Sequence, residues 1–232
     1  MSNPSTHGSG STAAPCRIGA FFDVDNTLIP GPALEVRFFR HLYKQGLVGL
    51  GDMLKSVGYL LQHLPTISLH PLRERKLYLE GKRPEMIEPL ADAFIQQELR
   101  PLVSRAAMAR LEEHQRNKHL VVFITGCPEF LIRPLAKPLG VDTIFCAQPD
   151  LDETGAYTGH LTLPLPYGAG KRALVEEFAH AQGLNLKDCH AYGDSPGDEE
   201  ILLAVGHPLV VNPIRGMYAI ANKYHWPVVK WE

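Results

Sequence analysis

The stretch FFDVDNTLIP, from Phe21 to Pro30, decides the fold class of this chain. It closes an apolar run that begins at Ile18, and it then sets two aspartates, Asp23 and Asp25, one residue apart. Side chains at positions i and i+2 of an extended segment point the same way. Both carboxylates are therefore expected to face one crevice, where their mutual repulsion has to be relieved.

Four further apolar runs have the length and composition of buried parallel strands. They are HLVVFIT (119–125), VDTIFCA (141–147), DCHAYGD (188–194) and HPLVVN (207–212). Helical patterns follow three of the strands, at 128–140, 171–183 and 198–206. Because strands and helices alternate, the sequence predicts an α/β fold with a Rossmann-like, three-layer core and a parallel sheet. A β-hairpin is expected at 150–163, outside that alternation.

Residues 32–106 break the alternation of strands and helices. Three segments there have a helical period with no strand between them: EVRFFRHLYKQGLV, MLKSVGYLLQHL and MIEPLADAFIQQEL. We therefore expect an all-helical cap at 32–106, inserted into a core made of 17–31 and 107–232. Residues 1–16, rich in Ser, Gly, Thr and Pro, are expected to form a flexible tail.

Composition excludes several classes of partner. The 232 residues carry a formal net charge of -2 with acids and bases interspersed, so no basic face for nucleic acid is expected. No apolar stretch approaches the roughly 20 residues that span a bilayer. The four cysteines are widely spaced, which favours reduced thiols and a cytoplasmic location.

The eleven histidines show no spacing that is typical of metal ligands. Neither H-x-H nor H-E-x-x-H occurs, so surface and packing roles are expected for them. His207, near the edge of the predicted core, is expected to be structural.

Polar residues follow the predicted strands where the carboxyl ends of a parallel sheet gather ligands. These residues are Asp23, Asp25 and Thr27 after the first strand, Thr125 and Gly126 after the second, and Asp194 and Asp198 near the end of the strand at 188–194. Four carboxylates at one edge repel one another unless protons or a cation are bound. A hard, oxygen-ligated cation such as Mg²⁺ would satisfy them.

Taken together, four short motifs resemble those of the haloacid dehalogenase-like superfamily, in its phosphoserine-phosphatase-like branch. DVDNT is similar to the first motif of that family, FITG to the second, GAGKR to the third and YGDSPGDEE to the fourth. Their order agrees with the family, and so does a long helical insert between the first two motifs. The resemblance covers nearly the whole chain after the tail.

The resemblance implies a role for each residue. Asp23 would be the nucleophile that forms an aspartyl-phosphate, and Asp25 would protonate the leaving alcohol and then activate water. Mg²⁺ would be held by Asp23, the backbone carbonyl of Asp25 and Asp194, with Asp198 supporting either the metal shell or Lys171. The phosphate would be bound by Thr27, Thr125, Gly126 and Lys171.

The third motif, GAGKR, also invites a nucleotide-binding interpretation, because Gly-rich loops cradle phosphates. A P-loop needs a glycine five residues before the Gly-Lys pair and a Ser or Thr after it. Leu165 and Arg172 occupy those two positions here. The sequence therefore excludes a P-loop.

The resemblance implies a magnesium-dependent phosphomonoesterase that acts on a small phosphorylated metabolite. Pro32 stands where phosphoserine phosphatases carry a glutamate for the substrate amine, which lowers the expectation of phosphoserine itself, although Glu35 is near in sequence. An amino-alcohol phosphate, histidinol phosphate or a phosphoserine-like compound, is expected. Two alternatives stay open at this point: a phosphotransferase on the same scaffold, and a non-catalytic module that binds phosphometabolites.

Overall fold

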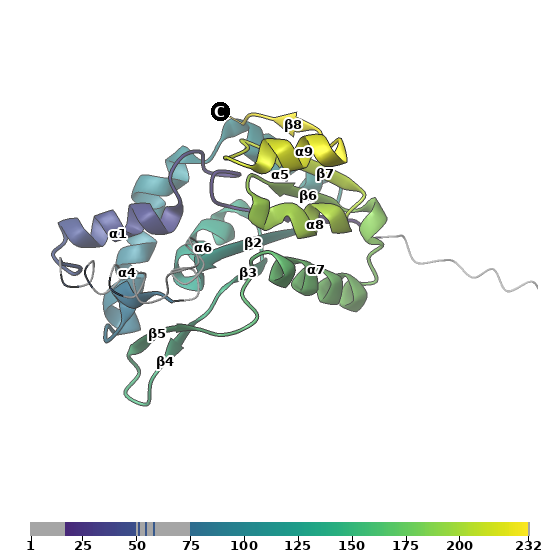
Figure 1. Cartoon of the computed structure of the whole chain (residues 1–232). Coiled ribbons are helices and arrows are strands. Elements are labelled where there is room, and N and C mark those ends of the chain that lie inside the picture. The colour runs from purple at the N-terminus through teal and green to yellow at the C-terminus, as the bar shows by residue number, and fades with distance from the viewer. Residues whose placement is uncertain (1–16, 50, 52–53, 55–57, 59–74, 232) are drawn as a thin grey trace, which may run out of the picture.

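A parallel sheet of six strands lies at the centre of the described part of the chain (Figure 1). The structure is a computed structural model, and it describes residues 17–49, 51, 54, 58 and 75–231. In chain order the strands are β1 (Gly19–Phe22), β2 (Leu120–Pro128), β3 (Thr143–Ala147), β6 (His190–Gly193), β7 (His207–Val211) and β8 (Val228–Val229). Their order across the sheet is β3-β2-β1-β6-β7-β8. The five predicted strands are confirmed, and β8 extends the sheet by one short edge strand.

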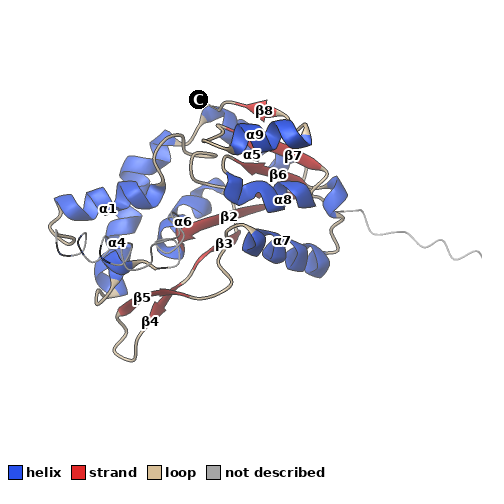
Figure 2. Ribbon diagram, viewed as in Figure 1, coloured by secondary structure: helices blue, strands red, loops and turns tan. Residues whose placement is uncertain are grey.

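Helices cover both faces of the sheet, as Figure 2 shows. One face carries α5 (Arg105–Arg116) and α6 (Glu129–Ala136), and the other carries α7 (Ala169–Gln182), α8 (Glu199–Ala204) and α9 (Met217–Tyr224). Neighbouring residues of β1 pack into the two layers because side chains alternate across a strand. Phe22 belongs to the apolar cluster that includes α5 and α6, whereas Phe21 belongs to the cluster with α7, α8 and α9. The predicted three-layer α/β core is confirmed.

Two helices of this core, α5 and α9, were not expected from the sequence. The first turn of α5 is capped by Ser104, whose Oγ accepts a hydrogen bond from the Ala107 N–H at 3.4 Å. The α5 sequence, RAAMARLEEHQR, carries many charges, so its apolar stripe is narrow. Helix α9 follows Gly216, which has a φ of 92° that other residues rarely adopt.

The inserted segment contains the helices α1 (Leu34–Lys44) and α4 (Pro84–Phe94) in its described part. Helical turns continue from α4 through Leu102. Phe38 of α1 packs on Phe94 of α4 and on Phe130 of α6, with ring centroids 5.4 and 5.9 Å apart. Two of the three predicted helices are thus present. Of the third, MLKSVGYLLQHL, only Leu54 and Gly58 are described, both as helix, and the rest lies outside the described residues, as does the tail at 1–16.

The predicted hairpin is present as the antiparallel strands β4 (Pro149–Leu151) and β5 (Tyr157–Leu161). It contacts the helical turn at Leu77–Leu79 through the backbone. The Lys76 N–H donates to the Gly159 carbonyl at 2.7 Å, and the Gly81 N–H donates to the Tyr157 carbonyl at 2.9 Å. The hairpin therefore fixes the position of the segment that carries Lys76 and Tyr78.

Within the described ranges, no helix combines the length and the apolar character that crossing a membrane requires. The described cysteines Cys127, Cys146 and Cys189 are buried and free of disulfides.

Candidate active site

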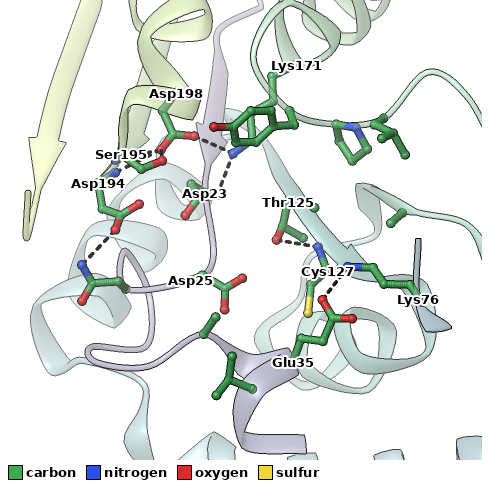
Figure 3. Close-up of a pocket in the computed structure, with 18 of the residues that line it drawn as sticks. Asp23, Asp25, Glu35, Lys76, Thr125, Cys127, Lys171, Asp194, Ser195 and Asp198 are labelled. Carbon is green, nitrogen blue, oxygen red and sulfur yellow. Dashed lines mark hydrogen bonds and ion pairs between the residues drawn. The ribbon is translucent and has the colours of Figure 1, made fainter. Parts of the chain in front are cut away.

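A cavity of about 660 Å³ opens at the carboxyl ends of the central strands, beside the inserted segment. Most residues predicted for the site line it: Asp23, Asp25, Thr125, Gly126, Lys171, Asp194 and Asp198. Figure 3 shows Asp23, Lys171, Asp194 and Asp198 on one side of the cavity and Glu35 and Lys76 on the other, with Asp25 and Thr125 between them. The fold thus brings together residues that are up to 175 positions apart in the chain.

Asp23 follows β1 directly and is held from both its backbone and its side chain. Its N–H donates to the Tyr192 carbonyl at 2.9 Å, which continues the hydrogen bonding between β1 and β6 by one residue. Oδ1 accepts a hydrogen bond from Lys171 Nζ at 2.6 Å. Oδ2 is buried and has no hydrogen-bond partner among the described residues. One carboxylate oxygen of Asp23 is therefore available to a ligand.

Lys171 lies buried between two carboxylates, since its Nζ also donates to Asp198 Oδ1 at 2.6 Å. Burial alone would lower the pKa of Lys171, but Asp198 and Asp23 outweigh burial and raise it. The lysine therefore stays charged. At the start of α7 a buried cation opposes the helix dipole, and the two carboxylates offset that cost.

Asp198 anchors the loop after β6. Its Oδ2 accepts hydrogen bonds from the Asp194 N–H at 3.2 Å, the Ser195 N–H at 3.1 Å and the Ser195 hydroxyl at 2.9 Å. Gly193 is required for this arrangement, because a Cβ at that position would lie 2.5 Å from the Asp198 Cβ. Both carboxylate oxygens of Asp198 thus already have donors.

Asp194 is oriented by Asn26, a residue that the sequence placed in the first motif without giving it a role. Asn26 Nδ2 donates to Asp194 Oδ2 at 2.9 Å and to the Asn212 carbonyl at 2.8 Å. Asn212 in turn donates to the Asn26 carbonyl at 2.8 Å. Both asparagines have positive φ, 55° and 45°. Asn tolerates this backbone conformation better than most residues, which explains the residue type.

Asp25 connects the core to the inserted segment. Its Oδ1 accepts a hydrogen bond from the N–H of Leu34, the first residue of α1, at 2.6 Å. Burial is the main reason that the pKa of Asp25 is raised, and this helix N–H opposes the shift. A raised pKa suits a carboxyl group that has to donate a proton at neutral pH.

Thr125 and Gly126 lie within β2, because the strand continues to Pro128 with a shift in its pairing after Ile124. The expectation that they follow the strand was therefore wrong. Thr125 is buried, and its Oγ1 accepts a hydrogen bond from the Cys127 N–H at 3.2 Å. Gly126 is exposed at the cavity.

Thr27 is the predicted site residue that the structure does not bring to the cavity. It is fully buried and is not part of the cavity wall. Its hydroxyl has no hydrogen-bond partner among the described residues. The motif pattern placed Thr27 in the site because it lies two residues after Asp25, but the chain turns there, with Asn26 in the left-handed region.

The inserted segment adds an ion pair that sequence reasoning missed. Lys76 Nζ donates to Glu35 Oε2 at 2.5 Å, and both side chains line the cavity together with Tyr78. Lys76 is 5% exposed and Glu35 23%. Glu35 was suspected from its place after the first motif, whereas no local pattern marks Lys76.

Electrostatics at the carboxylates favour a bound cation. Carboxylate oxygens of Asp23, Asp194 and Asp198 lie within 4.8 Å of one another. Burial, with the neighbouring Asp198, raises the pKa of Asp194 to about 7, and burial also raises the pKa of Asp23. The unpartnered Oδ2 of Asp23 offers an oxygen to such an ion. These residues therefore fit a hard dication, which prefers oxygen ligands.

The comparisons with known proteins agree with this site. Residues 20–202 match the family described as haloacid dehalogenase-like hydrolase. A probable phosphatase of Mycobacterium tuberculosis is 31% identical over 227 residues, which cover 96% of this chain and 78% of the relative.

Two solved structures share the fold. A protein of unknown function from Bordetella pertussis has a TM-score of 0.80 at 24% identity, covering 94% of this chain and all of the other. A phosphoserine phosphatase described as a phospho-aspartyl intermediate analogue has a TM-score of 0.64 at 17% identity, covering 94% of each chain. The predicted resemblance and the expectation of a phosphatase-type enzyme are confirmed: this chain belongs to the haloacid dehalogenase-like hydrolase family.

Proposed function

We propose that this protein is a magnesium-dependent phosphomonoesterase that hydrolyses a small phosphorylated metabolite through an aspartyl-phosphate on Asp23. The observation that carries the proposal is the carboxylate of Asp23, held on one oxygen by a buried lysine and unpartnered on the other within the described part of the chain. The phosphatase name of the Mycobacterium relative supports the reaction class.

In the first step, a carboxylate oxygen of Asp23 attacks phosphorus while Asp25 donates its proton to the leaving alkoxide. The raised pKa of Asp25 supports this role, because burial favours the protonated form that donates to the leaving group. In the second step, Asp25, now ionised, takes a proton from a water that attacks the same phosphorus. The Asp23–phosphate bond breaks, and inorganic phosphate leaves.

The cavity provides positive charge and donors for the transferring group. Lys171 would neutralise charge on Asp23 and on the phosphoryl oxygens. Thr125 and the Gly126 N–H would donate hydrogen bonds to those oxygens. Positioning and electrostatic stabilisation carry most of phosphoryl transfer, so each of these contacts is expected to matter more to kcat than to binding.

Magnesium is proposed on the oxygen ligands of Asp23, the Asp25 backbone carbonyl and Asp194. When bound, it would supply charge stabilisation to the phosphoryl oxygens. The cavity wall contains five carboxylates, Asp23, Asp25, Glu35, Asp194 and Asp198, against the three basic groups of Arg75, Lys76 and Lys171. A dication balances that excess. Because both oxygens of Asp198 already accept hydrogen bonds, we assign Asp198 the support of Lys171 and of the metal shell.

The substrate is proposed to be an amino-alcohol phosphate, such as histidinol phosphate or a phosphoserine-like compound. Glu35 lies across the cavity from Asp23, with Asp25 between them, at the place where a substrate amine would end. Lys76 Nζ donates to Oε2 of Glu35, and a substrate ammonium group would bind Oε1 of the same carboxylate. The division into a core and a cap at 32–106 is part of this proposal, since Glu35 and Lys76 come from the inserted segment.

A phosphate-release assay with Mg²⁺ and an aryl phosphate tests the reaction. Asp23→Asn and excess chelator are each expected to abolish turnover, whereas Asp142→Asn, at an exposed position outside the cavity, keeps it. Full activity in Asp23→Asn would contradict the mechanism.

A matched substrate panel tests the substrate class. Histidinol phosphate and phosphoserine are compared with glycerol phosphate, which lacks an amine. Glu35→Gln is expected to lower kcat/KM for the amines selectively and to leave the value for glycerol phosphate near that of the parent. An equal loss on all substrates would show that Glu35 acts on the fold or on the phosphate, and not on an amine.

A further inference from the structure

Histidines gather at the amino ends of the parallel strands, opposite the active site, which lies at their carboxyl ends. His119 precedes β2, while His190 and His207 are the first residues of β6 and β7 and pair with each other in register. His114 reaches the same place from the last turn of α5. The strands are parallel, so their amino ends share one edge. His190 is four residues from Asp194, about 13 Å at the usual rise of a strand.

Three of these imidazoles converge closely enough to share one ion. Nδ1 of His114 lies 2.7 Å from Nδ1 of His119. One nitrogen from each of His114, His119 and His190 lies within 4.8 Å of the other two. His114 is buried, whereas His119 and His190 are half-buried. The cluster is therefore buried on the inner side and accessible to solvent on the outer side.

We propose that His114, His119 and His190 form a second metal site, which takes a transition-metal dication of the Zn²⁺, Co²⁺ or Ni²⁺ type with water in the remaining positions. Imidazole nitrogen suits these ions, whereas Mg²⁺ prefers oxygen. The two sites of the protein are thus separated by ligand chemistry as well as by distance. Bound metal would join α5 to the starts of β2 and β6 and stabilise that edge of the sheet.

Tyr192 supplies the outer contact that such a site needs. Its hydroxyl lies 2.6 Å from Nε2 of His114. When Nε2 carries the proton and donates it to the Tyr192 oxygen, the lone pair of Nδ1 faces His119. Ligating histidines usually have their second nitrogen fixed in this manner. A modest widening of the 2.7 Å separation, through rotation of the half-buried His119, brings both Nδ1 atoms to ligand positions.

Burial favours the neutral form of the imidazoles, which ligation requires. Burial and the neighbouring His190 and His119 lower the pKa of His114 to about 3, and burial with His207 lowers the pKa of His190 to about 4. The nearest charged groups on α5 are Arg110 and Glu113. They form an ion pair at 3.0 Å, so the repulsion of the guanidinium toward a metal is largely offset.

The sequence did not indicate this cluster, because His190 is 71 positions after His119 and 76 after His114. Spacing rules recognise metal-binding histidines that are close together in sequence. Here the three histidines meet only because the folded sheet brings their strands and α5 together. A hydrogen-bonded and stacked imidazole cluster without metal is the competing account, and it predicts that no transition metal binds at this edge.

The test is a titration of the untagged, full-length protein with Zn²⁺ in the presence of saturating Mg²⁺, with competition against a chromogenic chelator. One equivalent is expected to bind, with a rise in the thermal midpoint. Co²⁺ is expected to give visible absorption bands of a nitrogen-ligated ion. His119→Gln and His190→Gln should each lose this equivalent, and Tyr192→Phe should weaken it by about 10–100-fold.

His180→Gln is the matched control, since His180 is exposed on α7 and lies outside the cluster. It should bind as the parent does. His119→Gln and His190→Gln change half-buried positions, and retained phosphate release shows that they fold. The proposal is overturned if the parent binds no equivalent, or if the equivalent survives in both His119→Gln and His190→Gln.

Discussion

The ammonium nitrogen of Lys171 lies 2.6 Å from Oδ1 of Asp23, and both side chains are buried at the carboxyl edge of the sheet. Because Lys171 also neutralises Asp198, its removal leaves two buried carboxylates without a cation. Removing one partner of a buried ion pair costs about 3–5 kcal/mol, because the other charge is left buried and unpaired.

Lys171→Met is therefore expected to lower the free energy of unfolding by that order and to abolish phosphate release. Urea unfolding in Mg²⁺-free buffer measures the first effect. Lys171→Arg keeps the charge and is expected to restore part of the stability but little activity, because a planar guanidinium does not replace a compact ammonium. A Lys171→Met protein as stable as the parent would contradict the role of the ion pair.

Asp25 is expected to matter differently in the two chemical steps. Loss of a general acid costs roughly 10²–10⁴-fold in rate. A phenolate is a good leaving group that needs no general acid. Asp25→Asn should therefore still release one equivalent of the phenol from an aryl phosphate, and turnover should then stop at the phosphorylated enzyme. On an alkyl phosphate both steps should be slow. Rapid-mixing measurement of the aryl alcohol distinguishes this burst from the uniform loss that a merely misfolded site would give.

The core of this fold was predictable because the five predicted strands each contain a short apolar stretch, with a polar residue near its end. Phe21 and Phe22 with Asp23 are the clearest example: two residues that pack into opposite layers, followed by one that faces the cavity. Helix α5 crosses the predicted boundary between the cap and the core at 106, and α9 follows the last predicted strand, so neither fell within a segment to which an element was assigned.

The half of the site that comes from the core was predictable for the same reason, and the half from the inserted segment was not. Asp194 and Asp198 lie in a short loop whose glycines constrain it. Lys76 reaches the cavity only through tertiary packing of its turn against Gly159 of the hairpin, 83 residues later, so no local pattern could mark it. Thr27 is the converse case: its motif position predicts phosphate binding, but its buried side chain is not part of the cavity wall.

The carboxylates are expected to make the metal-free protein less stable as the pH rises. The pKa of Asp194 is raised to about 7, above its ordinary value of 3.8, mainly by burial. A raised pKa means that the contribution to stability is complete below about pH 4 and is lost as the pH rises through 7.

Asp194→Asn removes that loss, so in chelator its thermal midpoint should exceed that of the parent at pH 8 and approach it at pH 5. Each kcal/mol corresponds to about 2–4 °C for a chain of this size. Mg²⁺ should raise the midpoint of the parent more at pH 8 than at pH 5, and should leave Asp194→Asn nearly unchanged. Equal curves for the two proteins in chelator would contradict the repulsion.

Gly193 is expected to tolerate no side chain. A Cβ there would lie 2.5 Å from the Asp198 Cβ, so Gly193→Ala has to displace the loop that anchors Lys171. Overpacking of this kind costs about 1–3 kcal/mol. The rate of phosphate release should fall by more than the loss of folded protein accounts for, because the displaced loop holds Asp198 against Lys171. Gly49→Ala is the control, because a Cβ at that exposed position meets no atom within 4 Å.

The central claim, that Asp23 is the nucleophile, is tested most directly by locating the phosphoryl group on the protein. The Asp25→Asn variant is mixed with Mg²⁺ and an aryl phosphate, quenched in acid, and digested for peptide mass spectrometry. We predict one added phosphoryl group on Asp23, removed by hydroxylamine and absent when Asp23→Asn is combined with Asp25→Asn. A phosphoryl group on another residue, or a burst of aryl alcohol with unmodified protein, would contradict the account.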